Sequence, residues 1–368
     1  MRHRFHAICP YFAMFPESFA EKWIERLTRR GDVVLDLFSG RGTTATCSLL
    51  LERKAIASDV NDVAYCLTKA KTNAPTRETA LKKVRKLRSE FSSRRFGREA
   101  EKLPEFFHHA FHPQTLKQIL FLRCALEWRT QKTDTMIAAL ALGALHGEAD
   151  KSSAYFSNQM PRTISTKPGY SVKFWAARSM VAPERNVFDL LEAAVQYRYR
   201  SSRPTGEAII LNLDMRMLPR MKSLFPGPIR CVITSPPYFD VTNFEEDQWL
   251  RLWFLGGPPH PTTKRLSRDD RHVIEASYWR FIADMWRSLG NILARSAHVV
   301  LRLGSSRLST DELERQIVAT SHFSGRKVEL ISTDCSVIKK RQTDAFRPGS
   351  VGCKVEIDYH FRMTGKRP

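Results

Sequence analysis

Residues 32–60 read DVVLDLFSGRGTTATCSLLLERKAIASDV, and this stretch decides the fold. The apolar run at 32–38 is typical of a strand covered on both faces, and the glycine-rich turn after it leads into a helical pattern. A second extended run, KAIASDV (54–60), follows that helix. Strand, turn, helix and strand in this order predict a β-α-β unit.

The alternating pattern returns after residue 205. Extended runs occupy AIILNLD (208–214), RCVITS (230–235), HVVLRLG (298–304), KVELISTDCSVI (327–338) and CKVEIDYHFRM (353–363), and SYWRFIADMWRSLGNILARS (277–296) has a helical pattern. We therefore expect an α/β fold, a Rossmann-like sheet with helices on both faces and a terminal hairpin at its edge. Residues 1–75 and 206–368 would form its two halves, and 76–205 a largely helical insertion.

The net charge of +21 and the pI of 9.9 indicate a polyanionic partner, either nucleic acid or an anionic membrane surface. The excess is uneven, because residues 76–205 hold 23 Lys and Arg against 12 Asp and Glu. Within them, KKVRKLRSEFSSRRFGREAEK (82–102) has nine basic and three acidic residues. This run predicts DNA contact if the partner is nucleic acid, and otherwise a solvated helix face.

Other features argue against secretion, membrane insertion and metal binding. The seven scattered cysteines form no pair at zinc or redox spacing and suit a reducing compartment. MIAALALGAL (136–145) is half the length of a membrane span and predicts a buried helix. His108, His109 and His112 lack further ligands at metal-binding spacing. We expect a soluble cytoplasmic protein without a metal.

The glycine turn predicts a cofactor site. GRGTTA (40–45) fits the pattern G-x-G-x-x-A at the start of a helix, which suits NAD, FAD or S-adenosylmethionine; the alternative is a helix start that only needs a tight turn. Asp59, 19 residues after Gly40, could bind a ribose hydroxyl. Asp36 and Phe38 would suit a cationic amino group better than a pyrophosphate, and Asp214 could contact an adenine amine.

A second loop, TSPPY (234–238), predicts the catalytic site. Two consecutive prolines fix φ and remove two N–H donors, so a rigid, donor-poor loop would project from the carboxyl end of a strand. Its carbonyls and the Ser235 hydroxyl can accept hydrogen bonds from an amine, and a base can stack on the ring of Tyr238. Such contacts would hold a weakly nucleophilic exocyclic amine in line for attack.

DLFSGRGTT and TSPPY together resemble the amino-group DNA methyltransferases, and HAICPYFAMFPESFAEKWIERL (6–27) resembles their cofactor-covering motif. The resemblance implies S-adenosylmethionine as cofactor, with Asp59 at the ribose and Asp214 at the adenine. The residues that it places at the methionine part and in the glycine loop are Asp36, Phe38, Ser39, Gly40, Gly42 and Thr43. The residues that it places at the target base are Ser235, Pro236, Pro237 and Tyr238.

Serine before the two prolines is usual in the N4-cytosine branch of this family, so the resemblance implies methylation of a flipped cytosine at N4 in double-stranded DNA. The order of the motifs is the reverse of that in many N4-cytosine enzymes. The alternatives are N6-adenine methylation, methylation of an RNA base, or an inactive DNA-binding relative. A cognate restriction endonuclease would be an optional partner, and the protein would associate with the nucleoid.

The remaining candidates concern DNA recognition. The polar stretch SNQMPRTISTKPGYSVKFW (157–175) predicts a loop, and its side chains Asn158, Gln159, Arg162 and Lys167 suit contacts with base edges. Phe239, directly after the catalytic loop, is a candidate wall of the base pocket. Trp249, Trp253 and Phe254 fit better in the core of a helix.

Overall fold

The computed structural model describes residues 3–11, 15–147, 154–158, 167–239, 244–262, 274–305, 307–337, 353 and 355–365. The chain divides into two compact units. We call residues 13–68, 204–243 and 266–368 the sheet unit, and residues 1–12, 69–203 and 244–265 the helical unit. The sequence boundaries at 75 and 206 differ from this division, since residues 1–12 and 244–265 group with the helical unit.

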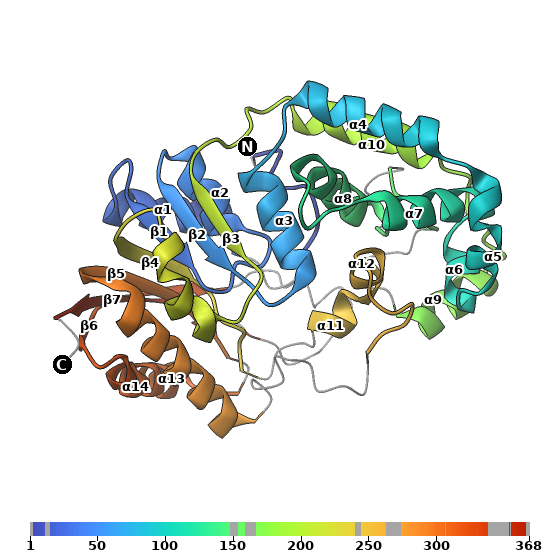
Figure 1. The fold of residues 1–368 in the computed structure, drawn as a ribbon. Helices are drawn as coiled ribbons and strands as arrows, with labels where there is room; N and C mark the ends of the chain where they lie inside the picture. The colour runs from blue at the N-terminus through green and yellow to red at the C-terminus, as the bar shows by residue number, and fades with distance from the viewer. Residues whose placement is uncertain are drawn as a thin grey trace. The chain divides into compact units, whose positions relative to one another are not determined.

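The sheet unit contains one seven-stranded sheet with the order β3-β2-β1-β4-β5-β7-β6 (Figure 1). The strands are β1 (Val33–Asp36), β2 (Lys54–Ser58), β3 (Ala208–Leu211), β4 (Ile229–Thr234), β5 (Leu293–Gly304), β6 (Lys327–Val337) and β7 (Val355–Thr364). Strands β1 to β5 pair in parallel, and β7 runs antiparallel to both of its neighbours. This topology confirms the predicted Rossmann-like α/β class.

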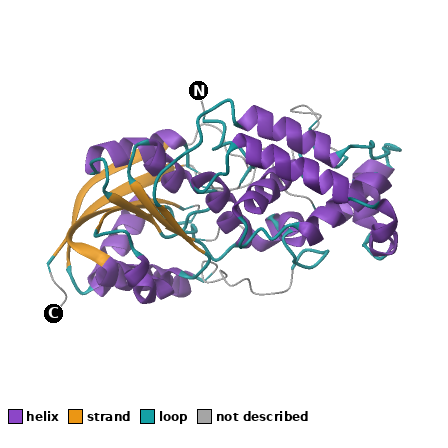
Figure 2. Ribbon diagram, turned by 45° about the horizontal axis from the view of Figure 1, so that its top comes forward, coloured by secondary structure: helices purple, strands orange, loops and turns teal. Residues whose placement is uncertain are grey.

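Alternation along the strands gives the sheet two apolar faces, and helices cover both (Figure 2). On β1, Val33 and Leu35 belong to a cluster with α13 and α14, whereas Val34 belongs to a cluster with α1 and α2. These helices are α1 (Glu17–Leu27), α2 (Thr43–Leu50), α13 (Glu275–Ile292) and α14 (Thr310–Thr320). The continuous apolar run of β1 is thereby explained, because each face of the strand is buried.

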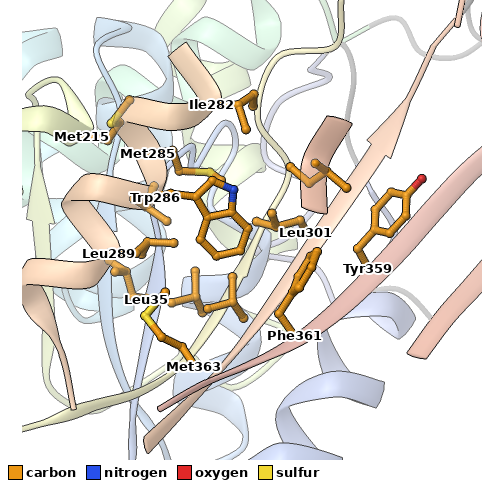
Figure 3. Close-up of a cluster of buried hydrophobic side chains, with 14 of the residues drawn as sticks. Leu35, Met215, Ile282, Met285, Trp286, Leu289, Leu301, Tyr359, Phe361 and Met363 are labelled. Carbon is orange, nitrogen blue, oxygen red and sulfur yellow. The ribbon is translucent and has the colours of Figure 1, made fainter. Parts of the chain in front are cut away.

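The larger of these two clusters lies between α13 and the sheet (Figure 3). Trp286 of α13 is fully buried, and its ring meets that of Phe361 edge-on at 5.2 Å between centroids. Leu35 and Leu301 bring the central strands into the same cluster. The core therefore ties the antiparallel hairpin to the parallel strands.

One boundary in this unit differs from the prediction. The helical pattern at 277–296 predicts a longer helix, but α13 ends at Ile292 and Leu293 begins β5. Ser296 pairs with Thr364 of β7, so the sheet takes the residues that the helical pattern also fits. The short helices of this unit are η2 (Met215–Leu224) and η4 (Ser321–Ser324), and α3 (Asp62–Thr72) crosses the boundary between the units.

The helical unit contains helices α4 (Arg77–Glu90), η1 (Ser93–Phe96), α5 (Gly97–Glu101), α6 (Glu105–Ala110), α7 (Pro113–Ala125), α8 (Lys132–Ala144), α9 (Pro168–Ala176), α10 (Val187–Arg198), α11 (Phe244–Asp247) and α12 (Trp249–Phe254). Helix α8 is buried, as its sequence predicts, and so are Trp249, Trp253 and Phe254 of α12. The predicted loop at 157–175 is wrong in part, because α9 begins at Pro168, a residue that favours the first turn of a helix. Within the described ranges, no helix has the length and hydropathy that a membrane span requires.

Close packing between α13 and η4 predicts the effect of one methyl group. A Cβ at Gly290 would lie 2.0 Å from the carbonyl oxygen of Ser324, whereas a Cβ at Gly169 of α9 meets no atom within 4 Å. We expect Gly290→Ala to lower the free energy of unfolding by about 1–3 kcal/mol, since a backbone atom cannot move aside. Gly169→Ala should be neutral or stabilising by up to about 1 kcal/mol through helix propensity. Urea unfolding of both variants tests this, and equal effects would contradict it.

Candidate active site

Strands β1 and β4 are parallel neighbours in the middle of the sheet. The chain continues outward from β1 to β2 and β3 on one side, and from β4 to β5 on the other. Open α/β sheets bind ligands at such a switch point, outside the carboxyl ends of the strands. Residues 37–42, here called the glycine loop, follow β1 at this edge, and residues 235–238, the proline loop, follow β4.

Hydrogen bonds join the ends of these two strands directly. Thr234 Oγ1 donates to Asp36 Oδ1 at 2.6 Å. The backbone N–H of Phe38 lies within reach of both acceptors, 3.2 Å from Asp36 Oδ1 and 3.3 Å from Thr234 Oγ1. The last residue of β4 therefore fixes the first turn of the glycine loop.

Asp36 combines complete burial with an unused oxygen. The residue is 0 % exposed, and its Oδ2 atom has no hydrogen-bond partner among the residues described. Burial raises the pKa of Asp36 to about 6, although Thr234, the Phe38 N–H and Thr44 act in the opposite direction. The Thr44 hydroxyl donates to the carbonyl of Ile233 at 3.1 Å. A buried carboxylate with one free oxygen fits a cationic group such as an ammonium, which would satisfy that oxygen and favour the charged form.

The glycine loop turns as its sequence requires. Gly40 and Gly42 have φ angles of +48° and +76°, in the left-handed region that favours glycine. A Cβ at Gly42 would also lie 2.6 Å from Thr68 Oγ1, so the close approach of α3 excludes a side chain there. Ser39 and Thr43, beside these glycines, are buried.

Asp59 contacts the glycine loop directly, at the sequence spacing that suggested a shared site. Its Oδ2 accepts from the backbone N–H of Gly40 at 2.8 Å, and its Oδ1 accepts from that of Asn61 at 2.9 Å. An ionised carboxylate accepts hydrogen bonds, which is the role that a ribose hydroxyl as donor requires. The contact with ribose remains a prediction.

Asp214 has a local role that the sequence did not show. It precedes η2, and Arg216 donates to both of its oxygens, with Nε at 2.9 Å from Oδ1 and Nη2 at 2.9 Å from Oδ2. Strand β3 ends three residues earlier, at Leu211. Asn212 is the residue that links this strand end to β2, because its amide donates to the carbonyls of Asp59 and Val60. The contact of Asp214 with adenine remains a prediction.

The proline loop follows β4 as predicted, with Pro236 buried and Ser235, Pro237 and Tyr238 partly buried. Ser235 Oγ donates its proton to the carbonyl oxygen of Arg302 at 3.0 Å, which leaves its lone pairs as acceptors. The hydroxyl of Tyr238 donates to Glu356 Oε1 at 3.0 Å. Residues of β5 and β7 thus hold both polar side chains of the proline loop.

Two aromatic candidates lie close to α13. The ring of Phe38 is partly buried, 5.3 Å from that of Phe281 between centroids. Phe239 is buried, and its ring lies 5.7 Å from that of Tyr278. Phe239 therefore packs in the core of the sheet unit in this structure, and its place in a base pocket remains a prediction.

Several supporting residues escaped the sequence analysis. Thr234 was part of the motif but carried no assigned role, and nothing in the sequence marks Thr68 as a neighbour of Gly42. Glu356 and Asp358 could be detected in the sequence, because two acids at alternate positions of a strand lie on the same face of the sheet. Arg302 likewise interrupts the apolar run of β5, as a buried charge with a partner would.

The candidate recognition residues of the helical unit divide into three groups. Asn158 is 3 % exposed and donates to the carbonyl of His109 at 2.9 Å, so the prediction that it reads base edges is wrong for this conformation. Lys167 is exposed just before α9. Gln159 and Arg162 lie outside the described residues.

Ion pairs within the helical unit use part of the basic run at 82–102. Arg88 binds Asp189 at 2.6 Å and Glu192 at 3.3 Å, both on α10. Lys83 binds Asp134. Six basic side chains of this run are exposed and form no ion pair with another described residue, and we call them the basic face: Lys82, Arg85, Arg94, Arg95, Arg98 and Lys102.

Residues 3–70 match a family model named N6_N4_Mtase and described as DNA methylase. The matched segment includes β1, the glycine loop and β2. It supports the resemblance to amino-group methyltransferases, over 68 of the 368 residues. No curated protein matches the chain.

Two solved structures illustrate the distant structural likenesses. TrmN from Thermus thermophilus aligns at 10% identity and a TM-score of 0.37, over 98% of this chain and 51% of that chain, so this chain spans about half its length. The rRNA methyltransferase aviRa from Streptomyces viridochromogenes aligns at 15% identity and a TM-score of 0.33, over 95% and 86%. At these TM-scores neither likeness bears on the substrate of this protein.

The raised pKa of Asp36 predicts a pH dependence of stability. The folded state holds this proton up to about pH 6, whereas the unfolded chain releases it near 3.8, so the contribution of Asp36 to the free energy of unfolding falls between these values as pH rises. Two pKa units correspond to about 3 kcal/mol. Asp36→Asn removes this titration, so its stability relative to wild type should increase by that order from pH 4 to pH 7. Urea unfolding at several pH values measures the difference, and a pH-independent difference would contradict the prediction.

Proposed function

We propose that this protein transfers a methyl group from S-adenosylmethionine to an exocyclic amine of a base in double-stranded DNA, with the N4 amine of cytosine as the first candidate. The observation that supports this most is the hydrogen bond between Thr234 and Asp36. This bond connects the glycine loop, which suits a cationic cofactor, with the proline loop, which suits an amine. The bound cofactor would supply a methyl group activated by its positively charged sulfur.

The residues around the glycine loop fit the cofactor. Asp36 Oδ2 is buried and unpartnered among the described side chains, so it would accept a hydrogen bond from the ammonium of the methionine part. The carboxylate of Asp59 is held beside the glycine loop by the Gly40 N–H and would accept hydrogen bonds from the ribose hydroxyls. Both carboxylates stand at the carboxyl ends of adjacent strands, β1 and β2.

The proline loop would bind and orient the target amine. The Ser235 hydroxyl donates its hydrogen bond to the Arg302 carbonyl, so its oxygen would act as an acceptor for the amine. Pro236 and Pro237 have no N–H, so their backbone cannot donate to the nitrogen lone pair that must attack. Acceptors that bind the amine hydrogens leave this lone pair directed at the methyl group, and Tyr238 offers a ring on which the base would stack.

The basic face of the helical unit supports DNA as the substrate. Its six side chains are exposed, and their charges are not neutralised by acids within the described chain. Such residues bind phosphates in any sequence context and supply much of the affinity for a duplex. The duplex must release the target base from the stack before its amine can enter the site. A serine at position 235 favours cytosine N4 over adenine N6 on the family resemblance.

Mass spectrometry of nucleosides from duplex DNA incubated with the protein and S-adenosylmethionine tests this function. We expect N4-methylcytosine with wild type and at least about a hundredfold less with Tyr238→Ala, because the base loses its stacking partner and its alignment. Phe323→Ala, which removes a partly exposed ring from η4, is the matched control and should methylate at the wild-type rate.

The products separate the alternatives. N6-methyladenine alone would replace the base assignment, and product from ribosomal RNA but not from duplex DNA would replace the substrate. Absence of methylation in every nucleic acid, with DNA binding intact, would overturn the enzymatic function in favour of a DNA-binding relative.

The basic face predicts how DNA affinity responds to salt. Lys82→Ala/Arg85→Ala removes two exposed charges of α4, so the slope of log Kd against log salt should decrease by about 1 for each phosphate that the protein no longer neutralises. The matched control is Arg295→Ala/Lys327→Ala, which removes two exposed charges at the amino ends of β5 and β6, away from the carboxyl edge of the parallel strands. Fluorescence anisotropy across a salt series measures both, and equal slopes for the two double variants would exclude α4 from the interface.

A further inference from the structure

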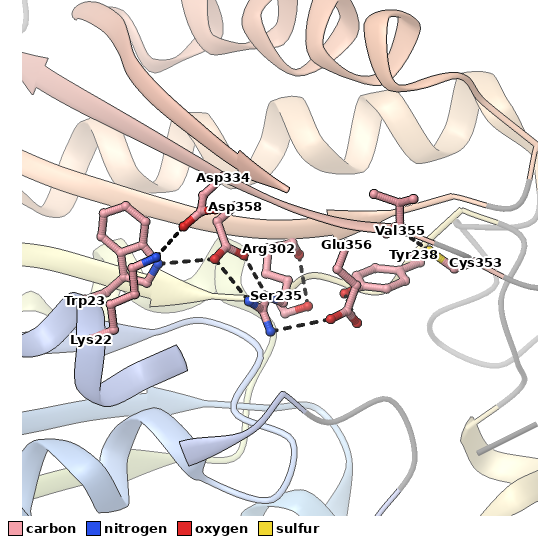
Figure 4. A network of polar contacts seen from close by, with 10 residues as sticks. All are labelled: Lys22, Trp23, Ser235, Tyr238, Arg302, Asp334, Cys353, Val355, Glu356 and Asp358. Atoms are coloured by element: carbon pink, nitrogen blue, oxygen red, sulfur yellow. Dashed lines mark hydrogen bonds and ion pairs between the residues drawn. The ribbon is translucent and has the colours of Figure 1, made fainter. Parts of the chain in front are cut away.

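A buried arginine lies behind the proline loop and binds two acids of β7 (Figure 4). Arg302 of β5 is 6 % exposed, and its Nε and Nη2 atoms donate to the two oxygens of Asp358 at 2.7 Å and 3.0 Å. Its Nη1 lies 3.4 Å from Glu356 Oε2. Its guanidinium lies over the ring of Phe19, 3.9 Å from the centroid. The orientation of Arg302 is therefore fixed on every side.

Two residues of the proline loop attach to this cluster. Glu356 accepts the hydrogen bond of the Tyr238 hydroxyl with Oε1, while its other oxygen faces Arg302. Ser235 donates to the backbone carbonyl of the same arginine. Strand β7 thus connects to the loop through one carboxylate that has an arginine on one side and a tyrosine on the other.

The backbone beside Tyr238 is packed closely enough to restrict the ring. A Cβ at Gly304, the last residue of β5, would lie 3.0 Å from Cε2 of Tyr238 and 2.4 Å from Sγ of Cys353. A side chain at this position would clash with Cys353 first and would also press on the edge of the tyrosine ring. The ring is therefore confined at its edge by Gly304 and at its hydroxyl by Glu356.

Stability alone does not account for such a cluster. Buried ion pairs are expensive to desolvate, and apolar residues of similar volume stabilise a core at least as well. The cluster also holds two carboxylates for one guanidinium, and each has a second donor: Trp23 Nε1 lies 3.4 Å from Asp358 Oδ2, and the tyrosine hydroxyl donates to Glu356. What the cluster provides is a fixed direction for each member, and Tyr238 is the member that belongs to the candidate site.

We propose, on the basis of the function proposed above, that Glu356 is a positioning residue, which fixes the ring of Tyr238 for the target base, while Arg302 and Asp358 hold Glu356 in place. Prolines at 236 and 237 restrict the backbone of the loop, but they leave the two side-chain torsions of Tyr238 free. The hydrogen bond from the Tyr238 hydroxyl to Glu356 restricts these torsions before the base binds. Binding of the base then costs less side-chain conformational entropy.

The titration of the Tyr238 hydroxyl tests its contact with Glu356 without any substrate. Burial and the Glu356 carboxylate raise the pKa of Tyr238 well above its usual value. Protein labelled with 3-fluorotyrosine gives one 19F resonance for this residue, assigned with Tyr238→Phe. We expect Glu356→Gln to lower the pKa of Tyr238 toward its usual value, because the negative charge beside the phenol is gone. Asp334→Asn is the matched control, since Asp334 lies on the neighbouring strand β6 but pairs with Lys22, and it should leave the titration unchanged.

Kinetics separate positioning from a merely structural role. We expect Tyr238→Phe and Glu356→Ala each to lower kcat for methyl transfer about tenfold with KM for DNA unchanged, and the double variant to be no slower than either. Glu356→Gln, which keeps an acceptor for the hydroxyl, should recover most of kcat. Multiplying effects in the double variant, or a wild-type kcat in Tyr238→Phe, would overturn the proposal.

The two measurements fail independently. If wild type methylates no nucleic acid, the proposed function fails, and the 19F titration still reports whether Glu356 holds Tyr238. A titration that Glu356→Gln leaves unchanged would overturn the role of Glu356 even in an active enzyme. If Glu356→Ala does not fold, Glu356→Gln and Tyr238→Phe carry the comparison, because both preserve the volume of the site.

Discussion

The candidate site depends on one buried hydrogen bond, from the Thr234 hydroxyl to the Asp36 carboxylate. Both residues end strands that are neighbours in the sheet, so the bond is set by strand register as well as by side-chain choice. It occupies one oxygen of Asp36 and leaves the other for a ligand. The glycine loop and the proline loop are therefore not independent, because the Phe38 N–H also lies within reach of Thr234 and the Thr44 hydroxyl donates to the carbonyl of Ile233 on β4.

The features that the sequence predicts correctly are those that a local pattern of residues determines. The β-α-β unit and the position of TSPPY at a strand end follow from patterns that neighbouring residues enforce. Helix α8 and the buried tryptophans of α12 were predictable because apolar side chains must be buried somewhere. In each case the pattern lies within one continuous stretch of the chain.

The sequence does not predict side-chain contacts or helix boundaries that a distant or competing partner determines. Arg216 binds both oxygens of Asp214, and no pattern distinguishes a carboxylate held by its neighbour from one facing a ligand. Asn158 looked like a residue of a polar loop, but a backbone carbonyl 49 positions away binds it in the interior. The boundary of α13 was set by pairing with β7, which begins more than 60 residues later. Such choices are made by tertiary contacts, for which local sequence contains little information.

The position of β7 between β5 and β6 has a consequence for how the protein is made. Strand β6 is synthesised before β7, and β7 is its only partner in the described sheet. The ladder hydrogen bonds of β6 can therefore form only after β7 has been synthesised. Glu356 lies on β7 and meets Tyr238 across 118 positions of the chain. The proline loop is thus synthesised before the glutamate that binds its tyrosine. Pairing of β7 with β5 and β6 therefore completes the sheet and brings Glu356 to Tyr238, and pairings over such distances along the chain generally slow folding.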